Sequence, residues 1–158
     1  MNNLLNIIGL SMLPISELRG GIPLALAYGF SPISAFLICT LANIIVIPIV
    51  FIFLEKINIL FLNIKPYKSF FHRTVEKSRQ KIHKKVEKYG YLGLMIFVAV
   101  PLPITGAYTG ALGAWALGMD KKKAFASIAL GVIIAGIIVT LVSYYGLYLL
   151  DIFIKKPV

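Results

Sequence analysis

The sequence has few of the residues that build disulfides, metal sites and charged surfaces. It contains one cysteine, two histidines and six acidic residues among 158. The single cysteine, Cys39, excludes an intrachain disulfide, and we expect it to be a small residue in an apolar core. His72 and His83 lie in a basic segment with no cluster of other ligand residues, so the spacing indicates neither a metal site nor a cofactor.

Charge is scarce and mostly of one sign. Charged residues make up 14% of the chain and hydrophobic residues 59%, which indicates a membrane protein. The net charge of +10 does not predict a nucleic-acid partner, because ten of the sixteen basic residues fall between Lys56 and Lys88. Lysine and arginine beside a membrane span mark the cytoplasmic side and attract anionic lipids. We expect a multi-pass cell-membrane protein with membrane lipids as partners and a cytoplasmic basic linker over residues 56–90.

The N-terminal segment does not have the pattern of a cleaved signal peptide. No lysine or arginine precedes its apolar run, and Glu17 and Arg19 interrupt that run. The small residues Ala25–Ala27 resemble a cleavage site, but the rest of the pattern is missing. We therefore expect this segment to be part of the fold.

Two apolar stretches are long enough to cross a bilayer. Ser31–Leu54 and Ala124–Leu150 contain no charged residue. A helix rises about 1.5 Å per residue and the hydrocarbon core is roughly 30 Å thick, so each stretch can span it. The sequence predicts two transmembrane helices.

Four other apolar segments have about half that length. Leu4–Leu13 and Ile22–Phe30 are separated by turn-forming residues, and Tyr91–Ala99 and Ala107–Met119 by the break Val100–Gly106. Each pair is typical of a re-entrant hairpin, which enters and leaves on one side of the membrane. In the alternative, each pair is one full spanning helix, but charges at a helix centre would then cost about 2.5–3.5 kcal/mol each. The turn-forming residues of the first pair are Pro14, Gly20, Gly21 and Pro23.

The two halves of the chain resemble each other at an offset of 89 residues. This register places Leu13–Ile15 on Leu102–Ile104 and Gly21 on Gly110. If the linker is cytoplasmic, the first hairpin enters from outside and the second from inside. The sequence predicts an all-α integral membrane fold in one domain, 1–158, with an inverted repeat of two units. Each unit is a re-entrant helical hairpin plus one transmembrane helix, over 4–55 and 91–154, and the basic linker 56–90 joins them.

Glu17 and Arg19 would lie near the tip of the first hairpin. Inverted repeats with broken helices are typical of membrane transporters, whose sites lie where the breaks meet. The two charges then either belong to a transport pathway or neutralise each other and hold the hairpin closed. The candidate pathway residues are Ser16, Glu17, Arg19, Gly20, Gly21, Pro23, Asn43, Pro101, Pro103, Thr105, Gly106, Tyr108 and Thr109.

Two motifs resemble a known family. SELRGGIPLA at 16–25 and PLPITGAYTG at 101–110 are similar to the paired signatures of small multidrug export proteins, which are related to the DedA superfamily. The resemblance implies two opposed re-entrant loops, with Glu17 matching the acidic residue of the first loop. In the better-known branches it implies proton-dependent drug tolerance or translocation of phospholipid or polyprenyl-phosphate carriers. DedA proteins carry arginines in the second loop, whereas Val100–Gly118 contains no charged residue.

We expect a membrane transporter, not an enzyme, that exports small molecules in exchange for protons. Flipping or scrambling of a lipid or polyprenyl-phosphate carrier is one alternative, and a structural or assembly role in the membrane is another. A lipid phosphatase would need a nucleophile or base and several cations, but Arg19 is the one cation near the candidate hydroxyls. A homodimer is expected, because a half-length hairpin leaves polar backbone that needs cover.

Overall fold

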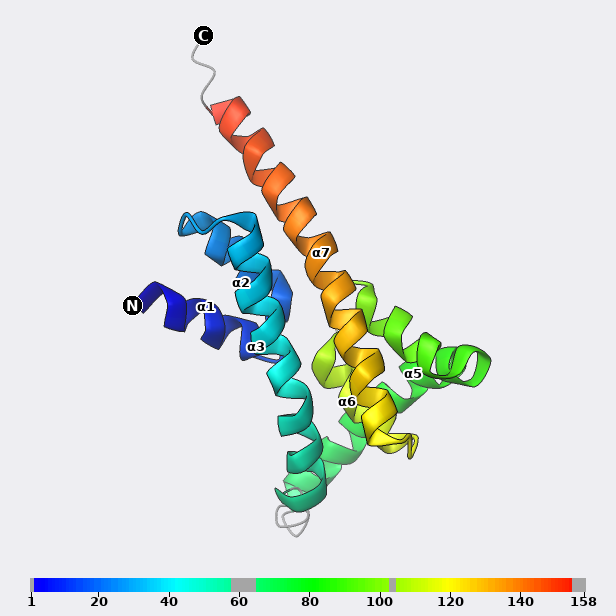
Figure 1. Ribbon diagram of the computed structural model, residues 1–158. Coiled ribbons are helices and arrows are strands. Elements are labelled where there is room, and N and C mark those ends of the chain that lie inside the picture. Colours follow the sequence, from blue (N-terminus) through cyan, green and yellow to red (C-terminus); the bar gives the residue numbers. More distant parts are fainter. Residues whose placement is uncertain (1, 58–64, 103–104, 155–158) are drawn as a thin grey trace. The chain divides into compact units, whose positions relative to one another are not determined.

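The computed structural model describes residues 2–57, 65–102 and 105–154, and all regular structure within them is helical (Figure 1). This confirms the predicted all-α class for the described residues. In chain order the elements are α1 (Asn2–Met12), α2 (Glu17–Ala27), α3 (Pro32–Ile52), the π-helical η1 (Phe53–Ile57), α5 (Lys65–Ala99), α6 (Ala107–Ala116) and α7 (Lys121–Ile154).

Two helical segments are long and apolar enough to cross a membrane, Pro32–Lys56 and Lys121–Gly146. They coincide with the two predicted spans. On α3, exposed apolar side chains recur every four residues, and residues at that spacing lie on one face of a helix. Such a stripe suits contact with lipid, because a contiguous apolar face is costly in water. The stripe consists of Ile33, Leu37, Leu41, Ile45 and Ile49.

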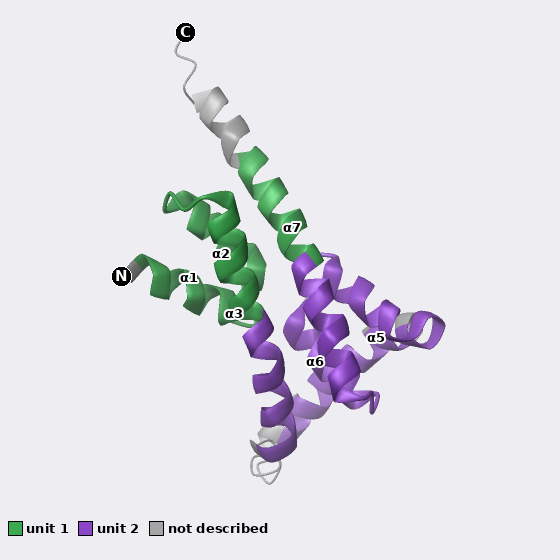
Figure 2. Cartoon of the chain, viewed as in Figure 1, with its two compact units in different colours: residues 1–43, 134–158 green, residues 44–133 purple. Residues whose placement is uncertain are grey.

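The chain divides into two compact units, shown in Figure 2. Unit 1 contains residues 1–43 and 134–158, and unit 2 contains residues 44–133. The divisions fall within α3 and α7, so each unit holds part of both helices. In unit 1, α1 packs against α2, and in unit 2, α5 packs against α6.

Glycine lets helices approach closely at equivalent places in the two units. A Cβ at Gly21 on α2 would overlap Ser11 Oγ of α1 and lie 3.1 Å from Cys39 Sγ of α3. A Cβ at Gly110 on α6 would lie 2.8 Å from Val98 Cγ2 of α5 and 3.4 Å from Ile128 Cγ1 of α7. Cys39 and Ile128, like the two glycines, are related by the 89-residue register. Small residues allow this close packing of membrane helices.

α2 and α6 end in the same C-terminal cap. In each, a glycine with positive φ follows the helix, Gly29 at 81° and Gly118 at 65°. Two N–H groups then bond back to helical carbonyls in the Schellman pattern, which glycine favours because it has no Cβ. The bonds of the first cap are Gly29 N to Leu26 O and Phe30 N to Ala25 O, and those of the second are Gly118 N to Trp115 O and Met119 N to Ala114 O.

The first hairpin turns earlier than its sequence predicts. The turn occupies residues 13–16, and α2 begins at Glu17, so Gly20, Gly21 and Pro23 lie inside the helix. Proline removes one helical N–H, whereas a break at these residues would leave several backbone groups without partners in an apolar setting. The prediction of a break at the glycines was therefore wrong.

The second hairpin follows the predicted boundaries more closely. α5 contains a non-helical residue at Gly90, with φ 56° and ψ −132°, between the polar linker helix and the apolar segment that begins at Tyr91. That segment ends at Ala99 and α6 begins at Ala107, as predicted. α7 begins at Lys121, which is 89 residues after the start of α3 at Pro32.

The close approach at Gly21 can be tested by adding one methyl group. The added methyl group of Gly21→Ala would push Ser11 and Cys39 away from α2. Overpacking of this kind lowers stability by about 1–3 kcal/mol. We expect a lower melting temperature for the purified variant in detergent. Gly9→Ala is the control, because a Cβ at Gly9 on α1 meets nothing within 4 Å and alanine favours helix. Equal melting temperatures for the two variants would contradict the packing.

Candidate functional site

The end of α1 joins α2 and α3 through Ser11. The Ser11 hydroxyl donates to the Ile7 carbonyl at 2.8 Å, and Asn43 Nδ2 of α3 donates to the Ser11 carbonyl at 2.9 Å. The Ser11 side chain also faces Gly21 of α2. Ser11 is fully buried and Asn43 is 1% exposed. This contact satisfies a carbonyl near the end of α1, where a helix lacks internal donors.

Two side-chain oxygens on α3 are buried and have no hydrogen-bond partner among the residues that the structure describes. They are Oδ1 of Asn43 and Oγ1 of Thr40. The residues are three positions apart and therefore lie on one face of the helix. An unsatisfied buried polar group costs about 1–3 kcal/mol. A hydrogen-bond donor or a cation that reaches these oxygens would therefore bind there favourably.

Thr40 lies where α3 and α7 cross within unit 1. A Cβ at Gly136 of α7 would be 2.7 Å from Thr40 Oγ1 and 2.9 Å from Cε2 of Phe36. The Gly136 carbonyl accepts a hydrogen bond from Thr140 Oγ1 at 2.7 Å. Glycine at this position therefore lets α7 lie directly against the Thr40 hydroxyl.

Glu17 is a buried carboxylate at the first residue of α2. It is 6% exposed, and its φ of 45° lies in a region that residues other than glycine rarely adopt. Such a conformation costs roughly 1–3 kcal/mol and often marks a functional position. Glu17 and Gly21 are four residues apart, so they share the face of α2 that meets Ser11 and Cys39. Arg19 is partly buried.

Ser16 and Thr105, predicted as pathway hydroxyls, are both engaged in the turns themselves. Ser16 donates to the Leu10 carbonyl near the end of α1. Thr105 Oγ1 lies 2.6 Å from the Val100 carbonyl oxygen and 2.9 Å from that of Leu102. Both hydroxyls therefore cap carbonyls that the end of a helix leaves without internal donors.

The remaining predicted residues of the second break lie in unit 2. Pro101 precedes α6, Gly106 is its buried N-cap, and Tyr108 and Thr109 are partly buried in its first turn. Pro103 lies outside the described residues. The structure thus groups Gly21 and Asn43 through Ser11 in unit 1, and the meeting of the two breaks stays a prediction.

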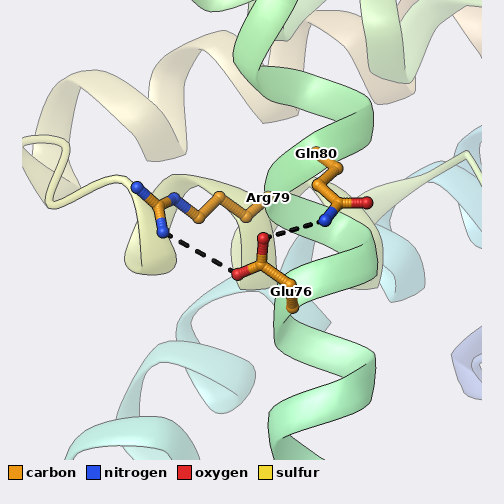
Figure 3. A network of polar contacts seen from close by, with 3 residues as sticks. All are labelled: Glu76, Arg79 and Gln80. Atoms are coloured by element: carbon orange, nitrogen blue, oxygen red, sulfur yellow. Dashed lines mark hydrogen bonds and ion pairs between the residues drawn. The ribbon is translucent and has the colours of Figure 1, made fainter.

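The charged side chains that the structure describes on the polar helix of the linker are exposed. Glu76 accepts a hydrogen bond from Gln80 Nε2 at 3.0 Å and pairs with Arg79 at 3.7 Å (Figure 3). His83 lies 3.3 Å from Glu87 one turn later. Glu76, Arg79, Gln80 and His83 line an open depression of about 560 Å³. Exposed pairs of this kind contribute at most about 1 kcal/mol, so we interpret them as a solvated helix surface.

Sequence reasoning missed Ser11 and the ion pair between Lys121 Nζ and Glu55 Oε1. Ser11 contacts a residue 32 positions away, which no local pattern indicates. Glu55 and Lys121 are 66 positions apart, but Glu55 directly follows the first predicted span and Lys121 lies three residues before the second. That shared place could have suggested their pairing.

Comparison with known families gives one match. Residues 17–138, about three quarters of the chain, match the family described as "Putative small multi-drug export protein". The chain belongs to this family. The match begins at Glu17 and includes α2, α3, α5, α6 and the first half of α7. The family description names multi-drug export, which indicates a membrane transporter. Searches of curated proteins and of solved structures gave no significant match, and the relation to the DedA superfamily stays a prediction.

The buried amide and hydroxyl of α3 should differ in their effect on stability. Asn43→Leu removes the donor to Ser11 and leaves that carbonyl unpaired, which costs about 1–3 kcal/mol. Thr40→Val keeps the shape and removes an oxygen without a partner, so it should leave stability unchanged or raise it. Melting temperatures in detergent measure both. A large loss in Thr40→Val would show that its hydroxyl has a stabilising partner.

Proposed function

We propose that this member of the small multi-drug export family exports small molecules in exchange for protons, with Glu17 as the coupling carboxylate. The observation that carries the proposal is the burial of Glu17 at a strained backbone position in a chain with two spans. An ionisable group inside a membrane protein is costly to keep and is a functional candidate for that reason.

The chemistry of coupling follows from burial. A carboxylate in a low-dielectric site is stabilised either by a proton or by a positive partner, and only one of these is needed at a time. A cationic substrate near Glu17 would therefore compete with the proton. Release of the substrate would be linked to protonation, which is how an exporter uses a proton gradient.

The unpartnered oxygens of Thr40 and Asn43 extend the proposed pathway along α3. Each can accept a hydrogen bond from a substrate or from water. Asn43 is tied to Ser11, which also faces Gly21 on the same side of α2 as Glu17. Two helices of unit 1 thus supply one buried carboxylate, from α2, and two buried acceptors, from α3. Thr40→Val should reduce transport while retaining stability if this pathway is used.

The proposed architecture is an inverted repeat of two re-entrant hairpins. Two observations at the 89-residue offset support the repeat: the matching C-terminal caps, and the contacts of Gly21 with Cys39 and of Gly110 with Ile128. The basic residues of α5 and the lysines at the start of α7 support a cytoplasmic location for both segments. In this arrangement the hairpin α1–α2 opens from the outside and the hairpin of unit 2 from the cytoplasm.

Replacement of the buried carboxylate tests proton coupling directly. Glu17→Gln keeps the side-chain shape but cannot exchange a proton. We expect the variant to insert and to keep its melting temperature. In proteoliposomes with an imposed pH gradient, it should lose at least tenfold in the rate of ethidium transport.

Glu76→Gln is the matched control, because Glu76 is exposed on the linker helix. It removes the same charge and should transport ethidium normally. Full pH-driven transport by Glu17→Gln would exclude the coupling role. A fall in melting temperature that matches the fall in activity would instead indicate a structural carboxylate.

Single-cysteine labelling tests the proposed topology. Cys39 is buried and would be replaced by alanine, and Lys77→Cys, Lys122→Cys and Ser31→Cys would be made in that background. A membrane-impermeant maleimide should label positions 77 and 122 from the cytoplasmic side and position 31 from outside. Labelling of 77 and 122 from opposite sides would exclude a re-entrant hairpin in unit 2.

A further inference from the structure

Unit 2 contains a cavity of about 340 Å³ beside the end of α3 and the start of α7. One part of its wall is apolar and consists of Pro48, Phe51 and Ile52 from α3 and Phe125 from α7. Ile52 and Phe125 are both exposed, at 53% and 37%. The apolar wall is therefore open to the surroundings of the helices.

The other part of the cavity wall is charged, with Glu55, Lys121 and Lys122. The Lys121 ammonium pairs with Glu55. Lys122 forms no ion pair with the side chains that the structure describes. The neighbouring Lys123 does not line the cavity and instead lies 5.9 Å from the ring centroid of Tyr91. The cavity thus has one excess positive charge.

The apolar and charged parts of the wall follow the order of the hydrocarbon and headgroup layers of a bilayer. The charge-free stretch of α3 ends at Leu54, directly before Glu55, and that of α7 begins at Ala124, directly after the lysines. The apolar wall therefore lies on the hydrocarbon side and the charged wall at the level of the headgroups. A phospholipid has the same polarity along its length.

We propose that this cavity binds an anionic phospholipid, with its phosphate at Lys122 and Lys121 and an acyl chain against Phe51, Ile52 and Phe125. The excess positive charge favours an anionic over a zwitterionic headgroup. The apolar wall favours a lipid over free phosphate, because only the lipid has an acyl chain that can contact it. Glu55 opposes binding, because it neutralises Lys121 and repels the phosphate.

The proposal is independent of the transport pathway. None of the cavity residues belongs to the cluster of Glu17, Thr40 and Asn43 in unit 1. Lipid binding is measured without transport, so the failure of either proposal leaves the other standing.

Native mass spectrometry of the full chain in detergent tests the site, with dioleoyl phosphatidylglycerol as the probe and dioleoyl phosphatidylcholine as the neutral comparison. Lys122→Gln should weaken phosphatidylglycerol binding about fivefold, the contribution of one lysine near anionic lipid. Lys123→Gln, which removes the same charge one residue away, should leave binding within twofold of the unaltered chain. Glu55→Gln should strengthen binding, because it releases Lys121.

A second pair of measurements identifies the source of the phosphate group. Phe125→Ala keeps every charge and should weaken binding of phosphatidylglycerol, and glycerol 3-phosphate in excess should not displace the lipid. Equal weakening by Lys122→Gln and Lys123→Gln would overturn the proposal in favour of diffuse attraction. Weaker binding in Glu55→Gln, or displacement by glycerol 3-phosphate, would overturn it as well. Melting temperatures confirm that each variant is folded.

Discussion

Backbone N–H and C=O groups in hydrocarbon need hydrogen-bond partners within the protein, and the two hairpins are built around this requirement. Each hairpin contains helix ends, and the backbone groups at these ends lack the partners that a continuous helix would supply. The turns compensate through hydroxyls, with Ser16 bonded to Leu10 and Thr105 to Val100. The second helix of each hairpin, α2 or α6, ends in a matching glycine cap. Asn43 then supplies a donor from α3 to the end of α1. Polar side chains and glycine caps thus pair backbone groups where these short helices end.

The long elements could be predicted from the sequence because their signal is local. Ser31–Leu54 and Ala124–Leu150 contain no charged residue, and both coincide with helices long and apolar enough to cross a membrane. The turn of the first hairpin was placed too late because glycine and proline have two meanings in membrane helices. Gly21 permits contact with Ser11 and Cys39, and this role outweighs its tendency to break a helix. Whether a glycine breaks a helix or permits a close contact depends on neighbours far along the chain, which composition does not reveal.

The candidate site was predicted in part. Asn43 was a candidate because it is a polar residue in an apolar span, and Glu17 because it is a charge in an apolar segment. Which of their atoms lack partners depends on atomic contacts. Asn43 uses its amide nitrogen at Ser11 and leaves its oxygen unpaired, whereas the hydroxyls of Ser16 and Thr105 are occupied. Among the described candidates, Asn43 thus has a buried oxygen without a partner and Glu17 is a buried carboxylate, while the role of the candidates in transport stays a prediction.

The other described carboxylates show why Glu17 stands apart. Glu76 and Glu87 are exposed and paired within their own helix, and Glu55 pairs with Lys121 beside the lipid cavity. Asp120 accepts a hydrogen bond from the backbone of Lys123 at the start of α7. In each case the charge lies at a helix surface or end. Glu17 is buried and sits on strained backbone. Glutamine would fill the same space with a neutral group, so packing alone does not require the carboxylate. Under the proposed function the carboxylate is needed because it can gain and lose a proton.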